Sequence, residues 1–379
     1  MSGWIDVPSS DELSKEQLDI YGYDLNKNLL INGAAGSGKT ILAVLRAKQL
    51  ADKNNKVLFI VFTNMLYQFT KLAAKSFNLS NKVHVVMLQD LTQEVMGSRL
   101  FMQNIDDSVI EKLAERFSYD HVVIDEGQDF PMWMYRKCFS RLGSRFTVCI
   151  DPKQSIYDTD FNKDELIGLY GGMIEKSLDF TYRNPVKILK LSVDYYMSRY
   201  RYAPVAQNMK IKVYNKQQGR IRYIHTNDEV KTIKDIIDNR GQDTVGVLLP
   251  RQKASGYIAQ GLQELGLREI EYYTSRSASS INFENEDPKI MTFWSAKGLQ
   301  FDTVVIPFLS NSYGSGNVFS KGENEMRAIY VAFTRARKNL YFIAEQNHTF
   351  PYEDDLNMEY VEETGKEEKI VNPGEIFDW

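Results

Sequence analysis

Short runs of β-branched and apolar residues alternate with amphipathic stretches along the first half of the chain. The runs that predict buried strands are residues 29–32, 56–62, 83–88, 121–125 and 146–151. The stretches that predict helices are residues 39–50, 65–77, 108–117 and 132–142. This alternation is typical of a parallel sheet with helices on both faces.

The second half repeats the pattern. Its predicted strands are residues 221–225, 244–249, 270–273, 290–293, 303–307 and 340–344. Its predicted helices are residues 185–200, 229–239, 255–265 and 325–336. Gly171-Gly172 lies between the halves as the natural linker, so we predict α/β domains at residues 1–172 and 173–350 and a tail at 351–379.

The composition is that of a globular protein, with 43% hydrophobic and 25% charged residues among 379. It excludes a wholly disordered or fibrous chain. The apolar runs are far shorter than the ~18 residues that cross a membrane, and the first residues show no secretory signal. Only Cys138 and Cys149 are present, too few for a disulfide framework or a zinc site, which favours the reducing cytoplasm.

The net charge of −4 is unevenly distributed. Residues 351–379 carry ten acidic residues and two lysines, a net charge of −8, which leaves +4 on the rest of the chain. A mildly positive body is compatible with nucleic-acid binding, although an acidic, solvated end explains the same numbers. Ile376, Phe377 and Trp379 give the tail apolar groups that either dock on a partner protein or fold back on the body.

One string, GAAGSGKT at residues 33–40, matches the phosphate-binding pattern GxxxxGK[ST] in full. It follows an apolar strand and opens a predicted helix, which is the context that the motif requires. Gly36 and Gly38 let the backbone curl so that its N–H groups face phosphate oxygens, and the helix N-terminus adds a favourable dipole. Lys39 is expected to reach the β- and γ-phosphates of ATP, and Thr40 to ligate Mg²⁺.

A second apolar strand ends in two acids, Asp125 and Glu126. Asp125 is expected to hold Mg²⁺, and Glu126 to polarise the water that attacks the γ-phosphate. An acidic pair at a strand end is common in solvated turns, but here it opens the much rarer string DEGQD at residues 125–129.

Six further strings follow one another along the chain. They are Gln17 before the phosphate loop, FTN at 62–64, DPKQSIY at 151–157, TYRN at 181–184, TFWSAKGLQFDTVV at 292–305 and YVAFTR at 330–335. With the two motifs above, they make the chain resemble the superfamily 1 helicases of the UvrD/Rep/PcrA type over most of residues 13–345. The resemblance implies two RecA-like P-loop NTPase domains with mainly parallel sheets and an ATP site in the cleft between them.

The resemblance also implies roles for the residues at matching positions. The catalytic residues would be Lys39, Glu126, Gln154, Arg183 and Arg335. ATP would be bound by Gln17, Gly33, Ala34, Ala35, Gly36, Ser37, Gly38, Lys39, Thr40, Tyr182, Gly298 and Gln300, and Mg²⁺ by Thr40 and Asp125. Single-stranded nucleic acid would contact Phe62, Thr63, Asn64, Tyr157 and Trp294. Cations fixed around the γ-phosphate stabilise the charge that develops there, and a site divided between two domains closes only when the domains close.

The spacing between motifs departs from that of the long family members. Only 85 residues separate Thr40 from Asp125, and 109 separate Arg183 from Thr292. The chain therefore has no room for the family's large inserted subdomains. We predict a compact two-domain motor that unwinds duplex poorly by itself.

Three positions also differ from the family pattern. The tryptophan that usually follows the DPKQSIY string is missing, and Tyr157 or Phe161 could replace it. Trp294 stands in place of a histidine, either as a stacking platform for bases or packed in the core beside Phe293. Gln300 replaces a glutamate, and its amide can still bind a ribose hydroxyl.

The motifs predict a Mg²⁺-dependent ATPase motor that moves along single-stranded nucleic acid. The resemblance implies DNA and 3′→5′ polarity, with RNA left open. The alternative is a regulatory ATPase subunit that switches a partner protein, such as a nuclease, in DNA repair or in defence against phage. The missing insertions and the aromatic tail favour a protein partner.

Overall fold

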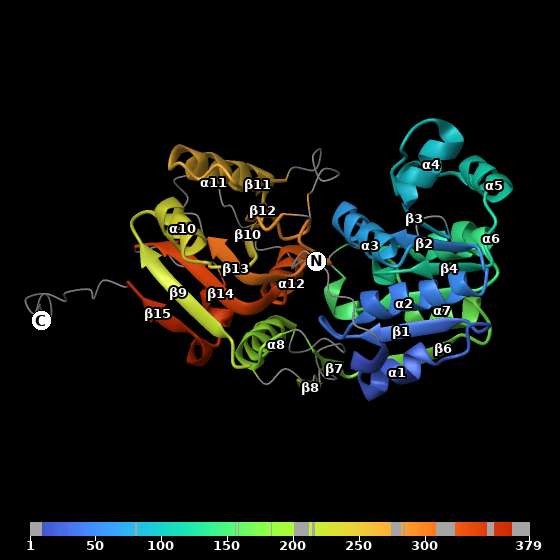
Figure 1. Cartoon of the computed structure of the whole chain (residues 1–379), viewed down its shortest axis with the longest axis horizontal. Coiled ribbons are helices and arrows are strands. Elements are labelled where there is room, and N and C mark those ends of the chain that lie inside the picture. Colours follow the sequence, from blue (N-terminus) through green and yellow to red (C-terminus); the bar gives the residue numbers. More distant parts are fainter. Residues whose placement is uncertain are drawn as a thin grey trace, which may run out of the picture.

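The computed structural model describes residues 10–79, 82–155, 157, 159–182, 184–200, 212–213, 217–273, 282, 285–307, 323–346 and 352–365. The two halves of the chain form separate sheets covered by helices, and Figure 1 shows the two units next to each other. This confirms the predicted α/β class, with two RecA-like units built on parallel sheets.

The first sheet has six strands in the order β3-β2-β4-β5-β1-β6, and all of its pairs between described residues are parallel. The strands are β1 (Leu29–Gly33), β2 (Val57–Val61), β3 (Val83–Met87), β4 (His121–Ile124), β5 (Phe146–Ile150) and β6 (Ile174–Leu178). Every residue of β2, β4 and β5 is buried, as expected of parallel strands that are covered on both faces.

Helices cover both faces of this sheet. One apolar cluster lies under α1 (Lys15–Tyr21), α2 (Lys39–Asp52) and α3 (Asn64–Ser76). The other lies under α4 (Leu88–Met96), α5 (Asp107–Arg116), the π-helix η4 (Met134–Phe139), α6 (Ser140–Leu142) and α7 (Lys163–Leu169). Short 3-10 turns are η1 (Ser10–Glu12), η2 (Met102–Asn104), η3 (Gly127–Asp129) and η5 (Pro152–Gln154). Polar side chains cap several of these helices, and Ser14 and Thr63 each accept a hydrogen bond from an N–H of the first turn.

The second sheet has seven strands in the order β11-β12-β10-β13-β14-β9-β15, again parallel in all pairs between described residues. The strands are β9 (Arg220–Thr226), β10 (Val245–Leu249), β11 (Glu271–Tyr272), β12 (Lys289–Thr292), β13 (Phe301–Pro307), β14 (Ala336–Glu345) and β15 (Glu362–Thr364). One face packs against α10 (Glu229–Asp238) and α11 (Gln252–Glu264), and the other against α8 (Val186–Tyr200) and α12 (Glu323–Phe333). A small parallel pair, β7 (Phe180–Thr181) with β8 (Lys212–Val213), follows the first sheet.

The boundary between the units differs from the predicted linker at Gly171-Gly172. The strand β6 begins after these glycines and pairs with β1, so the first sheet extends to Leu178. The sequence of β6, IEKSL, contains two charged residues because this strand lies at the edge of the sheet and is partly exposed. Its pattern is therefore not that of a buried strand.

Part of the predicted tail packs against the second unit. Residues 352–365 form the turns η7 (Glu353–Asp355) and η8 (Met358–Tyr360) and the edge strand β15. Tyr352 and Leu356 join the apolar cluster under α8 and α12. Residues 352–365 thus belong to the second unit, whereas Ile376, Phe377 and Trp379, for which docking and fold-back were the alternatives, lie outside the described residues. No helix in the described ranges is long and apolar enough to cross a membrane.

Candidate ATP site between the two sheets

The phosphate loop lies between β1 and α2, where the sequence places it. Gly38 has a φ of 94° and precedes the first residue of α2, so a left-handed conformation that favours glycine starts the helix. A Cβ at Gly38 would lie 2.5 Å from Gln17 Nε2, so a larger residue would clash there. Gln17 itself donates to the carbonyl of Ser37 at 3.0 Å, which ties α1 to the loop.

Lys39 and Thr40 point toward the carboxyl ends of the strands. Lys39 Nζ donates to the carbonyls of Gly33 and Ala34 at 2.8 and 3.0 Å and lies 3.6 Å from Asp151 Oδ2. Thr40 Oγ1 donates to Asp125 Oδ2 at 2.6 Å. The two predicted metal ligands are therefore in direct contact.

The two acids at the end of β4 have different electrostatic surroundings. Burial and the charge of Glu126 raise the pKa of Asp125 to about 6. Burial alone would raise the pKa of Glu126, but the positive charges of Lys297 and Lys39 lower it to about 2. Glu126 also has a left-handed backbone with φ 54°, a strain that is concentrated at functional sites in proteins. The carboxylate of Glu126 is therefore ionised, and it accepts a hydrogen bond from Gln128 Nε2 at 2.5 Å.

Gln154 joins the two units. Its amide nitrogen donates to Asp151 Oδ2 at 2.6 Å, and its amide oxygen accepts a hydrogen bond from Arg335 Nη2 at 2.8 Å. Its backbone carbonyl accepts from Lys297 Nζ at 2.8 Å. A residue of the first unit thus contacts two cations of the second.

Lys297 forms buried ion pairs with the first unit. Its Nζ lies 2.6 Å from Asp129 Oδ2 and 3.4 Å from Glu126 Oε2, and all three side chains are buried. Burial lowers the pKa of Lys297, but Asp129 and Glu126 outweigh this effect and raise it. Lys297 therefore keeps its proton. Asp129 and Lys297 are in the quoted motifs, but their contact, 168 residues apart in sequence, was not predicted.

A cavity of about 310 Å³ lies where these residues meet. The predicted residues that line it are Gln17, Gly36, Gly38, Lys39, Thr40, Glu126, Gln154, Tyr182, Gly298, Gln300 and Arg335. Gly298 has a φ of 87° and a Cβ there would lie 3.2 Å from Leu66 of α3, so glycine permits close approach of the two units. The structure thus gathers residues from both sheets around one cavity.

The other residues predicted for the ATP site lie behind the lining of this cavity or outside the described ranges. Gly33, Ala34 and Ala35 support the loop, and Thr181 Oγ1 donates to the carbonyl of Ala35 at 2.9 Å. Asp125 lies behind Thr40. Arg183 lies outside the described residues, so its catalytic role stays a prediction.

Four residues that the sequence analysis did not select also line the cavity. They are Glu12, Ile41, Phe69 and Arg337. Arg337 follows Arg335 by two residues at the start of β14 and lies 3.2 Å from Asp302 Oδ2. Arg335 lies in the turn before β14, so strand alternation gave no signal for Arg337 in the sequence.

The residues predicted to contact nucleic acid form two groups. Phe62 packs against Tyr157 and Phe130, with ring centroids 4.7 and 5.1 Å apart, while Thr63 caps α3 and is followed by Asn64. Trp294 is partly buried against the core of the second unit, 6.3 Å from the ring of Phe293. Trp294 is therefore partly packed against the core, and its role as a stacking platform stays a prediction.

The residues of the loop suit a nucleotide with Mg²⁺. Ser37 Oγ is buried and has no hydrogen-bond partner among the described residues, as expected of a loop whose polar groups are arranged for phosphate. The hydroxyl of Thr40 and the carboxylate of Asp125 are hard oxygen donors, which Mg²⁺ prefers, and phosphates supply further ligands in such sites. Within the described ranges, no group of three or more His, Cys, Asp or Glu residues could hold a metal.

Comparisons with known families match both halves of the chain. Residues 267–347 match the UvrD-like helicase C-terminal domain, and residues 11–141 match the family of the type III restriction enzyme res subunit. A search of curated protein sequences found no match.

Three solved structures are among those similar to this one. The crystal structure of Arterivirus nonstructural protein 10 (helicase) is 12% identical over 90% of this chain and 64% of that chain, with a TM-score of 0.44. Its complex with DNA is 12% identical over 87% and 62%, with a TM-score of 0.40. The C-terminal domain of a possible DNA helicase from Lactobacillus plantarum WCFS1 is 15% identical over 49% and 99%, with a TM-score of 0.35. The chain thus spans less than two thirds of the length of the arterivirus helicase.

The two family matches fall on the parts of the chain that carry the motifs. The match at residues 11–141 covers the phosphate loop and the DEGQD string, and the match at residues 267–347 covers the TFWSAKG and YVAFTR strings. Together with the motifs, the two family matches support a superfamily 1 helicase-type protein.

Proposed function

We propose that this chain is a Mg²⁺-dependent ATPase motor that moves along single-stranded nucleic acid, with DNA and 3′→5′ polarity as the specific form. The observation that carries the proposal is the single cavity lined by the phosphate loop of one unit and by Gln300 and Arg335 of the other. Because the site is complete only when both units contribute, ATP binding favours closure and product release favours opening.

The ionised groups divide the chemistry of hydrolysis between the units. Lys39 and Arg335 would stabilise negative charge on the γ-phosphate as it is cleaved. The ionised carboxylate of Glu126 would orient the attacking water and receive its proton. Gln154, which contacts Arg335 at 2.8 Å, would report the presence of the γ-phosphate to the second unit. Arg183 would add a second cation from the segment that joins the units.

Aromatic side chains support the nucleic-acid part of the proposal. Phe62 and Tyr157 present paired rings at the end of β2 and after η5, and Trp294 follows β12 in the other unit. Because every base has an aromatic face, such rings bind single strands with little sequence preference, at ~1–3 kcal/mol per base. Two groups on separate units could hold a strand alternately during stepping.

Steady-state ATPase measurements with and without single-stranded DNA, single-stranded RNA and blunt duplex would test this function. We expect stimulation by a single strand, little stimulation by blunt duplex and no hydrolysis without Mg²⁺. The Glu126→Gln variant controls for contaminating ATPases. If no nucleic acid stimulates hydrolysis, the regulatory alternative replaces the motor, and a partner protein such as a nuclease in DNA repair or phage defence would be the stimulus to test.

A further inference from the structure

A second cavity lies in the first unit beside the edge strand β3, with a volume of about 530 Å³. Its walls come from α3 and α4, and Figure 1 shows these two helices on either side of β3. The lining residues are Lys56, Val57, Tyr67, Lys71, Ala74, Lys82, Val83, His84, Val85, Val86, Asp90, Glu94 and Tyr119. We call this cavity the β3 groove.

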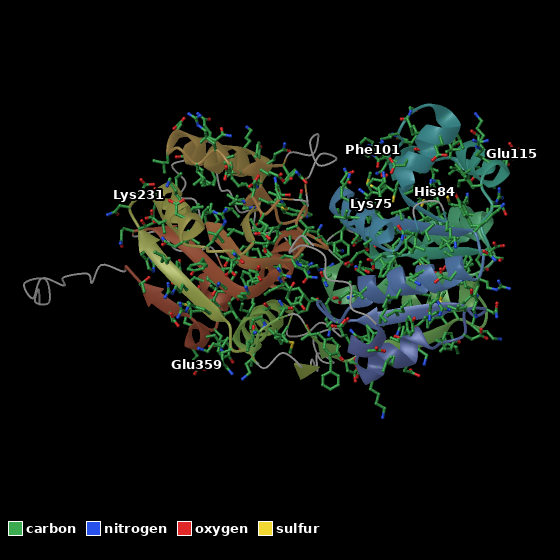
Figure 2. All side chains as sticks on the ribbon, in the orientation of Figure 1. Lys75, His84, Phe101, Glu115, Lys231 and Glu359 are labelled. Carbon is green, nitrogen blue, oxygen red and sulfur yellow. The ribbon has the colours of Figure 1, made fainter. Side chains whose placement is uncertain are left out.

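The β3 groove follows the outer edge of the strand. Val83 and Val85 belong to the apolar cluster under α3, whereas Val86 belongs to the cluster under α4 and α5. Because successive side chains of a strand point to opposite faces, a cavity lined by all of them runs along the edge itself. Figure 2 shows His84 in the region between α3 and α4.

The backbone of β3 directs polar groups into the β3 groove. Val83 donates its N–H to the carbonyl of Leu79 at 2.9 Å, and Met87 donates to Asp90 Oδ2 at 3.1 Å, so both N–H groups point away from β2. Alternation along the strand then points the N–H and carbonyl of Val85 the same way. Among the described residues, no hydrogen bond to these two outward groups is present.

Positive charge surrounds this edge. The ammonium groups of Lys56, Lys71 and Lys82 form no ion pair with any carboxylate in the described ranges, although Lys71 donates to the hydroxyl of Tyr67 at 3.1 Å. The two acids are already engaged: Asp90 binds Arg99 at 2.6 Å, and Glu94 lies 3.5 Å from the ring of His84. The rim is therefore suited to an anionic occupant.

We propose that the β3 groove binds an extended, acidic peptide segment of a partner protein, which adds to the sheet as a further strand beside β3. The backbone of Val85 would pair with the peptide, Tyr67 and Ala74 would contact its apolar side chains, and the three lysines would meet its acidic ones. Strand addition is a common mode of peptide recognition, with backbone bonds providing affinity and side-chain pockets providing specificity. The site is separate from the ATP cavity, since the two share no lining residue.

Fluorescence anisotropy with the labelled peptide EVEVEVE, acetylated and amidated, would test this site on the full chain. A copy N-methylated at alternate residues cannot pair as a strand, and the basic peptide KVKVKVK has the opposite charge. We expect binding of the acidic peptide alone, weakened by salt. Hydrogen exchange at the Val85 amide should slow when this peptide binds, a readout that needs no mutation.

Two lysines of α3 provide matched variants. Lys71 lines the β3 groove, whereas Lys75 is exposed on the same helix, is labelled in Figure 2 and does not line it. Lys71→Glu should raise the dissociation constant of the acidic peptide roughly 3–10-fold. One exposed ion pair contributes little, but the reversed charge at position 71 also repels the acidic peptide. Lys75→Glu should leave binding unchanged. Equal binding of the N-methylated peptide, equal effects of the two variants or full displacement by a single-stranded oligonucleotide would each overturn the proposal.

Discussion

The two units bring opposite charges to the cleft between them. The first unit contributes one buried lysine, Lys39, and four buried carboxylates, those of Asp125, Glu126, Asp129 and Asp151. The second contributes two buried cations, Lys297 and Arg335, which are 1% and 2% exposed. A buried charge without a partner is costly, so each unit neutralises groups that the other could not bury alone.

Apolar packing is distributed differently. Each unit has its own two apolar clusters, and the cluster under α8 and α12 receives only Leu72 and Tyr157 from the first unit among the described residues. The units therefore meet mainly through polar and charged groups. Such an interface can open without exposing a large apolar surface, which is what a motor requires of its cleft. The charged groups that join the two units are therefore the same ones to which we assign the chemistry.

Removing Arg335, a cation that the second unit brings to the ATP cavity, should have the largest effect on hydrolysis. Arg335→Ala leaves the phosphate loop intact but deletes a positive charge near the γ-phosphate, and we expect the turnover number to fall by about 10³-fold or more. Binding of a fluorescent ATP analogue should change much less. A variant with normal turnover would show that the second unit does not take part in the chemistry.

Removing the carboxylate of Glu126 in the first unit should have the second largest effect on hydrolysis. Glu126→Gln keeps the size of the side chain but cannot accept a proton, so we expect hydrolysis to fall by at least about 10²-fold while ATP still binds. Lys39→Ala should instead weaken binding, because it removes a phosphate contact. Single-turnover hydrolysis and equilibrium binding of both variants separate these routes, and hydrolysis by Glu126→Gln at the normal rate would contradict the assignment.

The contact between Lys297 and Asp129 tests the charge balance itself. Lys297→Met leaves Asp129 buried without its partner, which should lower the free energy of unfolding by roughly 3 kcal/mol or open the cleft. Replacing both residues, as Lys297→Met with Asp129→Leu, should restore most of this loss. Urea unfolding and the radius of gyration from small-angle scattering measure the two outcomes. Equal losses in the single and double variants would mean that the pair is not coupled.

The units should also respond to pH in opposite directions. Burial, with the charges of Arg46 and Arg145, lowers the pKa of His121 to about 3, so the first unit should lose stability as pH falls from about 6.5 toward 3. Burial and the charge of Glu345 raise the pKa of Glu229 to about 8, so the second unit should lose stability as pH rises from about 4.5 to 8.

Each dependence amounts to at most about 1.4 kcal/mol per pH unit within its window. Chemical denaturation from pH 5 to 8 should show that His121→Gln flattens the acid side of the stability profile and Glu229→Gln flattens the alkaline side. If both variants flatten the same side of the stability profile, the prediction that the two units respond to pH in opposite directions is wrong.

Local signals predicted most strands, most helices and the phosphate loop, because each depends on residues close together in sequence. The contact of Lys297 with Asp129 could not be predicted, because it depends on how two separately folded sheets meet. The edge strands β6 and β15 were missed, and the sequence of β15, EET, is exposed and has no apolar residue to mark it. Its Glu362 and Glu363 lie near Arg222 and His225 of β9, contacts that only the folded chain brings together.

The smallest effect concerns the aromatic groups on the two units. Trp294 is partly buried beside Phe293, so only part of its ring is available to a base. Trp294→Ala should raise the single-strand concentration for half-maximal ATPase stimulation by roughly 5–10-fold, in line with ~1–3 kcal/mol for a stacked base and partial exposure.

Phe62→Ala should raise the same concentration from the first unit, although the loss of this ring also frees Tyr157 to move. Basal ATPase without nucleic acid is the control and should change little. An unchanged half-saturation point with lower thermal stability would place Trp294 in the core, and nucleic-acid binding would then fall mainly on Phe62 and Tyr157 of the first unit.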